Sequence, residues 1–512
     1  MDENTVEIRD AASLWGESAA ATRERLKSEL GSDVKVMAVG PAGEHLVPFA
    51  TILADNDATA SGGFGGVMGS KKLKAVAVKG NRKPTAADPG RVRELVKQIM
   101  QLRKGTWDVY PSPAPGRTKR QACYGCSAGC MRQVYETEDG KRVKFFCQAA
   151  DFYRKAAFKF YKGWNDTIAH ATRLCNEYGL DTIVIQPMME WFIKCYQEGI
   201  LTEEETGIPL SKFGSYEFIE TMLRKISFRE GFGDTLAQGT LKAAELVGKG
   251  SQDLLGESIA TRANEMADYD PRLYITTGLL YALEPRRPIQ QLHEISFTMA
   301  QWMEWLKETK FGFLSTEPLM AIAEKFWGGR AAVDFSSAEG KALAAKKIQD
   351  RQYVKESLIL CDFLWPIIWV RFSESHVGES VLESRILSAV TGNEIDEEEL
   401  NRIGERIFNL QRAILIRDGW GGREGDQLPD YVHEVPLAKA FLNRECLAPG
   451  RDGETISRKG HVLERDVFEG LKDEYYELRG WDVESGLQTR SKLEELDLHD
   501  VADVLEKEGF LR

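Results

Sequence analysis

The chain has 512 residues, of which 43% are hydrophobic and 29% charged, and this composition is typical of a globular protein with room for about two to four domains. Its formal net charge of −12 argues against a general nucleic-acid binder, which needs a basic face to displace counterions. No run of about 18 apolar residues is present, so no membrane span is expected, and the acidic start MDENTVEIRD lacks the hydrophobic core of a secretory signal. Eight cysteines, three of them clustered, fit a reducing cytoplasm better than a disulfide scaffold.

Two segments near the start combine a strand with a glycine-rich turn. Residues 33–50 begin with the alternating apolar run VKVMAV, and residues 61–80 place the loop SGGFGG before the strand LKAVAV. Glycines let the backbone approach a phosphate closely, so Gly62 and Gly63 are candidate cofactor-binding residues. The alternative is a tight structural turn, since a loop placed before a strand fits neither a Walker loop nor a Rossmann fingerprint.

Three cysteines stand close together in the run CYGCSAGC, at Cys123, Cys126 and Cys130. Thiolates at this spacing can converge on one metal centre, and iron–sulfur clusters commonly combine such a local trio with a remote fourth cysteine. A structural zinc site is the main alternative, but it more often shows two paired knuckles, and the sequence has no second pair. A disulfide is less favoured because a bridge between cysteines this close in sequence is strained.

Beyond residue 85 the sequence reads as helical for most of its length. Asp88 is a candidate cap before Pro89, and residues 166–181 carry apolar residues at helical spacing with a stop at Gly179. Further helices are expected over residues 186–199, 215–248, 296–308, 338–359 and 400–416.

Cys361 is the candidate for the remote cysteine. It ends the apolar run SLILC at a helix-to-loop boundary and is followed by Asp362. The alternative is a core residue, because free cysteines are often buried. That alternative is preferred for Cys175, Cys195 and Cys446, which lie in helix-like segments.

Taken together, these motifs resemble the aldehyde:ferredoxin oxidoreductase family, tungsten enzymes that carry a bis-pterin metal cofactor beside one [4Fe–4S] cluster. The resemblance covers nearly the whole chain. It is carried by GPAGE (40–44), GGFGGVMGSKKLKAVAV (62–78), CYGCSAGC (123–130), CNEYGLD (175–181), YDPR (269–272), ESLILC (356–361), IGERIFNLQR (403–412) and YYELRGWD (475–482).

The resemblance implies an α+β fold that is mainly α. A remnant of the family's β-rich cofactor-binding domain is expected over residues 1–85, followed by a helical domain over 86–260 with the cysteine trio and the first pterin motif. A second helical domain over 261–512 would hold the second motif and the fourth cluster cysteine. A further N-terminal segment of the family is expected ahead of Asp2 and is missing from this sequence.

The resemblance also implies the cofactor-binding residues. The fourth cluster thiolate closes the family's second pterin motif, which is Cys361 here. The motifs, of the form DxxGLD and DxxGLC, hold the pterin rings, since carboxylates accept hydrogen bonds from ring N–H groups. The matching residues are Asn176, Leu180, Asp181, Glu356 and Leu360.

Three positions depart from these two motifs. Asn176 and Glu356 stand where the family usually has aspartate. Ile359 stands where it usually has glycine.

Three residues are predicted to be catalytic by their place in the resemblance. Cys147 falls where the family has a pocket glutamate, and its thiolate could ligate tungsten or simply pack between aromatic side chains. His293 is the nearest candidate for a pocket histidine and suits a general acid or base, with Gln290 equally placed by strict spacing. Glu284, like the pair Arg286–Arg287, could face an anionic substrate or solvent.

The primary functional prediction is an oxidoreductase with a tungsten (or molybdenum) bis-pterin and a [4Fe–4S] cluster, oxidising an aldehyde to a carboxylate. A ferredoxin-like carrier would accept the electrons, within a homo- or hetero-oligomer that could include iron–sulfur partner subunits. One alternative is the tungsten subunit of a class II benzoyl-CoA reductase, to which the pocket changes point. Another is a truncated, non-catalytic electron-transfer subunit, to which the missing segment points.

Overall fold

In the computed structural model the described residues are 5–80, 83–103, 114, 116–123, 126, 130, 132–145, 147–256, 259–261, 264–265, 268–363, 368–441 and 443–512. The chain divides into two compact units. The first comprises Met1–Lys83 with Tyr110–Ile259, and the second comprises Pro84–Val109 with Ala260–Arg512. The predicted division into three domains, with boundaries after residues 85 and 260, stays a prediction.

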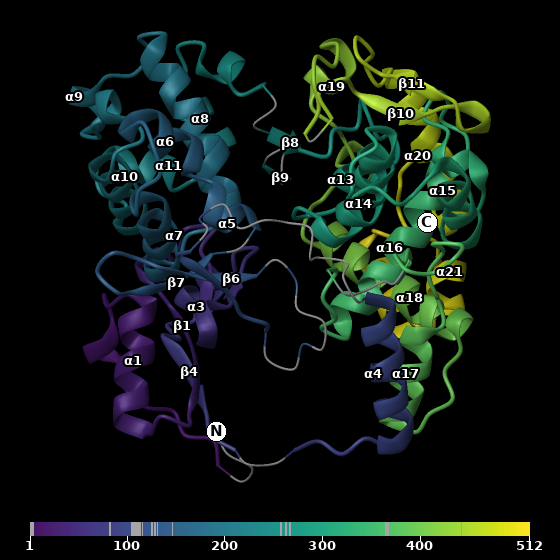
Figure 1. Ribbon diagram of the computed structural model, residues 1–512, viewed down its shortest axis with the longest axis horizontal. Helices are drawn as coiled ribbons and strands as arrows, with labels where there is room; N and C mark the ends of the chain where they lie inside the picture. The colour runs from purple at the N-terminus through teal and green to yellow at the C-terminus, as the bar shows by residue number, and fades with distance from the viewer. Residues whose placement is uncertain are drawn as a thin grey trace. The chain divides into compact units, whose positions relative to one another are not determined.

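A four-stranded antiparallel sheet lies in the first unit, in the order β3-β2-β1-β4; its strands β1 and β4 are labelled in Figure 1. Its strands are β1 (Lys35–Val39), β2 (Ile52–Ala54), β3 (Thr59–Ala60) and β4 (Ala75–Val78). In β1 the side chains of Val36 and Ala38 are buried while Met37 is exposed, as the alternation along a strand requires. Helix α1 (Ala19–Leu30) packs on this sheet through Ala19, which contacts Ala38 and Leu53 in one apolar cluster.

Helices make up most of the remainder of the first unit. They are α2 (Pro41–Glu44), α3 (Phe64–Ser70), α5 (Cys147–Asp151), α6 (Arg154–Tyr161), α7 (Thr167–Tyr178), α8 (Thr182–Gln197), α9 (Glu203–Thr206), α10 (Tyr216–Phe228), α11 (Phe232–Leu236) and α12 (Thr240–Val247). The single helix predicted over 215–248 is wrong: the chain forms α10, α11 and α12, because Gly231 (φ 55°) and Gly239 (φ 93°) adopt conformations that a helix cannot contain.

Two further small sheets complete the strands before residue 270. One joins β5 (Thr118–Arg120), β6 (Gln133–Glu136) and β7 (Arg142–Phe145) in sequence order, and the other pairs β8 (Ile259–Thr261) with β9 (Asn264–Glu265). The cysteine run therefore connects two antiparallel strands, β5 and β6.

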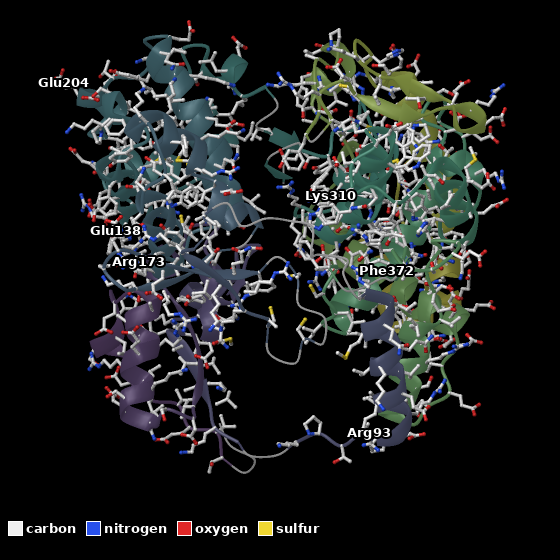
Figure 2. All side chains as sticks on the ribbon, viewed as in Figure 1. Arg93, Glu138, Arg173, Glu204, Lys310 and Phe372 are labelled. Carbon is white, nitrogen blue, oxygen red and sulfur yellow. The ribbon has the colours of Figure 1, made fainter. Side chains whose placement is uncertain are left out.

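The second unit is almost entirely helical. Its helices are α4 (Pro89–Arg103), α13 (Thr276–Ala282), α14 (Ile289–Leu306), α15 (Thr316–Ile322), α16 (Lys341–Ser357), α17 (Leu382–Thr391), α18 (Glu397–Arg417), α19 (Asp430–Glu434), α20 (Arg465–Arg479), α21 (Arg490–Glu495) and α22 (His499–Glu508), with one hairpin of β10 (Leu447–Pro449) and β11 (Thr455–Ser457). On α4 the apolar side chains of Leu95 and Ile99 are buried while Arg93 points outward (Figure 2). None of the described helices is long and apolar enough to cross a membrane.

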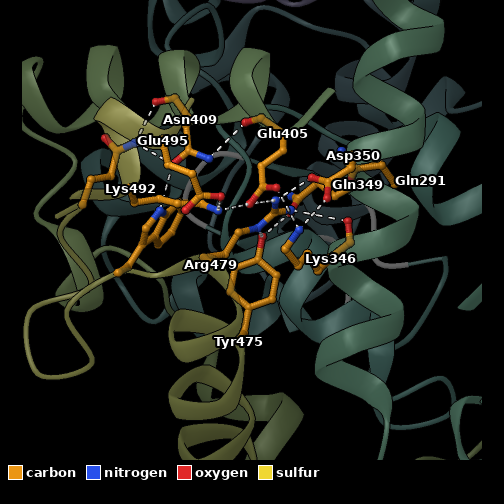
Figure 3. A network of polar contacts seen from close by, with 12 residues as sticks. Gln291, Lys346, Gln349, Asp350, Glu405, Asn409, Tyr475, Arg479, Lys492 and Glu495 are labelled. Carbon is orange, nitrogen blue, oxygen red and sulfur yellow. Dashed lines mark hydrogen bonds and ion pairs between the residues drawn. The ribbon is translucent and has the colours of Figure 1, made fainter. Parts of the chain in front are cut away.

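Helix α16 is the centre of the second unit, where it packs against α13, α14, α18 and α20. A network of buried charges between these helices is paired (Figure 3). The fully buried guanidinium of Arg479 on α20 donates to Asp350 at 2.5 Å and to Gln349 at 2.9 Å, both on α16. Such pairing is required because an unpaired buried charge costs several kcal/mol. The predicted mainly helical α+β fold is confirmed.

Helices α2 and α3 pack backbone against backbone, which only glycine permits. A Cβ added at Gly69 would lie 1.8 Å from the carbonyl oxygen of Gly43, and one at Gly43 would lie 2.7 Å from that of Gly65. Helix α2 lies in the GPAGE segment and α3 in the glycine-rich segment that follows. Their glycines therefore determine how closely the two helices pack, and not only where the chain turns.

Replacing Gly69 with alanine is expected to lower the thermal unfolding midpoint of the first unit by several degrees, because overpacking of this kind costs about 1–3 kcal/mol. Gly470→Ala in α20 is the matched control, since nothing lies within 4 Å of its added Cβ and alanine favours a helix by about 1 kcal/mol. Calorimetry of both variants checks this. An unchanged midpoint in Gly69→Ala would contradict the close approach of α2 and α3.

Candidate functional site

The glycine loop and the first pterin motif lie together in the first unit. The segment 49–51 connects them: Thr51 N–H donates to the Gly179 carbonyl at 2.8 Å, and Gly65 N–H donates to the Ala50 carbonyl at 3.0 Å. Gly63, at φ 82°, lies so close to the chain that an added Cβ would meet the Pro48 carbonyl oxygen at 2.6 Å. Gly62 also has a positive φ of 78°.

The GPAGE segment packs against the first pterin motif as well. A Cβ at Gly40 would come within 2.5 Å of the carbonyl oxygens of Glu177 and Tyr178, at the end of α7. The Glu44 carboxylate of this segment is buried and pairs with the Lys74 ammonium at 2.5 Å. Three separate sequence motifs are thus held in one place by backbone contacts and a buried ion pair.

The predicted pterin residues of the first motif follow the end of α7. Asp181 caps α8, with its Oδ1 accepting a hydrogen bond from Ile183 N–H at 3.0 Å. Leu180 is buried and pairs with Ala50 in a single β-bridge. Asn176 is half-buried on the last turn of α7.

The cysteine run lies in the loop between β5 and β6, and hydrogen bonds join the two ends of this loop. Gln121 N–H donates to the Arg132 carbonyl at 3.2 Å, and the Arg132 guanidinium returns a hydrogen bond to the Gln121 carbonyl at 3.0 Å. A second bond from Arg132 reaches the Asn56 carbonyl at 2.8 Å. Arg132 is only 7% exposed, so it fixes the base of the loop.

Within this loop the Cys130 thiol lies close enough to Cys123 and Cys126 to be affected by their charge. Cys126 N–H donates to the Cys123 carbonyl at 3.1 Å in a tight turn. Burial raises the pKa of the Cys130 thiol, the backbone N–H of Arg132 opposes the rise, and negative charge on Cys123 and Cys126 adds to it. A bound cation would reverse this mutual repulsion, which is the behaviour expected of a soft-metal ligand set. No group of three or more His, Cys, Asp or Glu side chains is arranged to hold a metal ion in the described part of the chain, so the cluster stays a prediction.

The second pterin motif ends α16 in the same way as the first ends α7. After α7, Gly179 has φ 80° and Leu180 N–H donates to the carbonyl of Cys175 at 2.8 Å. After α16, Ile359 has φ 57° and Leu360 N–H donates to the carbonyl of Lys355, also at 2.8 Å. A left-handed residue followed by this backward bond is a common way to end a helix.

The residues of the second motif are held within the second unit. Leu360 packs beside the apolar cluster of α4 and α17. Glu356 forms an ion pair with Arg286, and burial raises the pKa of its carboxyl while Arg286 opposes the rise. Cys361 is exposed, and its Sγ lies 3.9 Å from Oδ1 of Asp362.

A cavity opens beside this helix end. His293 of α14 lies in it, with its Nδ1 in close contact with the Asp362 carboxylate and its ring stacked on Phe297 at 4.1 Å. Burial opposes ionisation of Asp362, yet the hydrogen bond and charge of His293 hold the pKa of Asp362 below its usual value. The lining residues are Arg103, Gln290, His293, Glu294, Phe297, Gln352, Lys355, Asp362, Ile368 and Trp369.

Arg103 and Lys355 are cavity residues that the sequence analysis missed. Arg103, at the end of α4, donates to the Phe363 carbonyl at 2.5 Å, and burial lowers the pKa of its guanidinium to about 10. Lys355 immediately precedes the second motif. The sequence did contain a signal for the burial of Lys355. Lys341, Ile348 and Lys355 are spaced seven residues apart, which places them on the same, buried face of α16.

Glu284 lies outside the cavity lining, in a saturated polar cluster. Its carboxylate accepts hydrogen bonds from Gln291 at 2.7 Å, Gln349 at 2.9 Å, Tyr353 at 2.7 Å and Gln411 at 3.1 Å. These contacts favour a structural role, and the catalytic role stays a prediction that none of them supports. The side chain of Cys147 lies outside the described residues.

Comparisons with known proteins identify the family of this chain. The family model "Aldehyde ferredoxin oxidoreductase, N-terminal domain" matches residues 1–80, and "Aldehyde ferredoxin oxidoreductase, domains 2 & 3" matches residues 68–498. The chain belongs to the aldehyde ferredoxin oxidoreductase family.

The individual relatives described next share 27% or less of their sequence with this chain. A tungsten-containing aldehyde ferredoxin oxidoreductase of Pyrococcus abyssi (strain GE5 / Orsay) is 27% identical, with 98% of this chain and 79% of that protein covered. An aliphatic sulfonate oxidoreductase, WOR-like subunit, of Pyrococcus furiosus is 25% identical over 97% of this chain and 78% of that protein. A chain of the solved structure described as the active site complex BamBC of benzoyl coenzyme A reductase with 1,5-dienoyl-CoA shares the fold at a TM-score of 0.68 and 22% identity, covering 100% of this chain and 81% of that one.

Replacing Ile359 with glycine is expected to raise the unfolding midpoint of the second unit. A side chain in the left-handed region costs about 1–2 kcal/mol, which glycine avoids. Ile359 is 91% exposed, so its removal loses little packing. Ile359→Ala keeps a Cβ and is the matched control, with a midpoint near that of the unmodified protein. In calorimetry, a glycine variant that melts below the alanine variant would contradict a strained helix end.

Proposed function

We propose that this chain is a tungsten (or molybdenum) bis-pterin and [4Fe–4S] oxidoreductase that converts an aldehyde to a carboxylate and passes two electrons, one at a time, to a ferredoxin-like carrier. Family membership supports the class of enzyme. The observation that carries the proposal is the repeated helix end, which presents Asp181 in one motif and Cys361 in the other directly after a buried or half-buried leucine.

The proposed ligands follow from these motifs. The cluster would be held by thiolates of Cys123, Cys126, Cys130 and Cys361. The pterin groups would be held by the side chains or backbone of Asn176, Leu180, Asp181, Glu356 and Leu360, with close backbone approach at Gly62 and Gly63. When bound, the metal–pterin group would supply a Lewis acid and a two-electron redox centre.

His293 is the proposed proton-transfer residue of this site. The Asp362 carboxylate faces its Nδ1, so Nδ1 carries the proton and Nε2 is left to exchange one with the substrate. Aldehyde oxidation adds one water oxygen and releases two electrons and three protons, so a base of this kind is needed. Phe297 and Trp369 provide apolar walls around it.

Reductive chemistry on an aromatic acyl-CoA thioester is the second candidate, favoured by the fold shared with the benzoyl-CoA reductase structure. Arg286 and Arg287, which could have faced an anionic substrate such as a coenzyme A thioester, contact other groups of the protein. Arg286 pairs with Glu356, and Arg287 lies 3.5 Å from Asp268 and over the ring of Tyr269. Aldehyde oxidation is therefore preferred, in an assembly that could include iron–sulfur partner subunits.

Metal analysis and turnover of the purified protein test this proposal. Tungsten or molybdenum with pterin is expected, together with aldehyde oxidation coupled to an electron acceptor. His293→Asn is expected to lower kcat by about 10²–10⁴-fold because proton transfer is lost, whereas His461→Asn, at an exposed position, should leave it unchanged. Turnover of an aromatic acyl-CoA thioester alone would overturn the aldehyde assignment. Iron and sulfide without tungsten or molybdenum would indicate a non-catalytic electron-transfer subunit.

A further inference from the structure

Helix α6 (Figure 1) carries a basic surface that has no part in the proposed chemistry. Residues 154–162 read RKAAFKFYK, with four Lys or Arg and no Asp or Glu, in a chain whose net charge is −12. Lys155, Phe158, Lys159 and Lys162 follow the spacing i, i+3, i+4 and i+7, so they share one side of the helix and its C-terminal cap. All four side chains are exposed. Positive charge is therefore concentrated on one side of α6.

The protein does not neutralise most of this charge. Arg154 lies 3.4 Å from the Asp151 carboxylate and is paired. Lys155, Lys159 and Lys162 form no ion pair and no side-chain hydrogen bond within the described part of the chain. Three ammonium groups of this surface are thus available to anionic groups outside the protein.

Three aromatic side chains protrude beside these lysines. Phe158 is 47% exposed, Phe160 41% and Tyr161 42%. Single exposed apolar side chains are normal on a protein surface, but three aromatic rings within four residues form a patch. The rings of Phe160 and Tyr161 lie 4.9 Å apart, and the Tyr161 hydroxyl accepts a hydrogen bond from Tyr216 N–H at 3.1 Å. The patch therefore belongs to folded structure and is held in place.

The other side of α6 fixes the helix to its unit. Ala157 is fully buried in the apolar core of the first unit. Gly214 packs so closely on the helix that an added Cβ would lie 2.2 Å from the Ala156 carbonyl oxygen. The lysines and aromatic rings are therefore presented outward by a helix that cannot turn them inward.

Composition distinguishes the kinds of partner that such a surface fits. Lysine is depleted in protein–protein interfaces, whereas lysine beside Phe and Tyr is typical of helices that lie on anionic bilayers. There the ammonium groups stay at headgroup level while the rings reach the acyl boundary. The net charge of −12 opposes approach to such a bilayer, but charges more than about 8 Å away are largely screened at physiological ionic strength. The local surface therefore decides.

We propose that the exposed side of α6 is a peripheral binding surface for an anionic phospholipid bilayer. Lys155, Lys159 and Lys162 contact the anionic headgroups, and Phe158 enters the interface between headgroups and acyl chains. Each lysine contributes a factor of about five to binding, so association is reversible and depends on salt. The inference goes beyond the proposed function and does not depend on it.

Cosedimentation of the whole protein with lipid vesicles tests this proposal. Binding is expected to vesicles of mixed phosphatidylglycerol and phosphatidylcholine, and not to vesicles of phosphatidylcholine alone. The triple variant Lys155→Gln, Lys159→Gln and Lys162→Gln is expected to bind about 100-fold more weakly, because three charges near the bilayer are lost. Phe158→Ser is expected to weaken binding without any change of charge, which a purely electrostatic contact would not show.

A second triple variant is the matched control. Lys79→Gln, Lys242→Gln and Lys249→Gln remove the same charge from exposed lysines of the same unit that lie outside α6, and should keep vesicle binding. Thermal unfolding midpoints of both triple variants should stay near that of the unmodified protein, since all six lysines are exposed.

Several outcomes would overturn the proposal. These are no binding to the anionic vesicles, equal binding to neutral ones, or equal loss of binding in the two triple variants. Self-association that depends on the α6 lysines, without vesicle binding, would identify a second copy of this chain as the occupant. Binding of poly-glutamate as tightly as of anionic vesicles would identify an acidic protein instead.

Discussion

A helix that ends inside a protein leaves its last carbonyl oxygens without partners, and the chain must turn sharply to satisfy them. In this protein α7 and α16 solve the problem identically, with a left-handed residue and a leucine N–H that bonds backward to the carbonyl five residues earlier. The turn fixes the direction of the next residue, which is Asp181 in one case and Cys361 in the other. The proposed chemistry depends on this geometry, because those residues are useful only if they point away from their own helix.

Backbone contacts and buried ion pairs fix the position of each helix end. In the first unit, the absence of a side chain at Gly40 lets the GPAGE segment pack directly against the end of α7. The buried ion pair of Glu44 and Lys74 fixes that segment in place. In the second unit, α16 is surrounded by packed helices whose buried charges are paired, as Arg479 and Asp350 are. Glu284 belongs to this supporting structure, since its four hydrogen bonds tie α16 to neighbouring segments. Lys355 departs from the pattern at the point where the cavity opens, because its buried Nζ has no hydrogen-bond partner among the described residues.

The sequence was sufficient to predict the helical class of the fold and the helix stop at Gly179. These follow from periodicity and from glycine at a helix end. The break of 215–248 into three helices was missed because its glycines are tolerated in a helical pattern until tertiary packing selects another conformation. Lys355 and Arg103 were missed because a charged residue on an apolar stripe suggests an exposed edge. The seven-residue spacing from Ile348 places Lys355 on the buried face of its helix, but side-chain packing is needed to show that Arg103 is buried as well. Ile359 was noted as a departure, but its strain is a property of the backbone.

The central claim is that the end of α16 delivers a cluster thiolate through Cys361. Low-temperature EPR of the reduced protein, with iron analysis of the same samples, tests it most directly. Cys361→Ser is expected to lose the signal of the reduced cluster and much of its iron, because a four-thiolate cluster is left with three ligands. Cys446→Ser, which changes a buried cysteine of the same unit, is expected to keep both. A Cys361→Ser protein with an unaltered signal and full iron content would contradict the account.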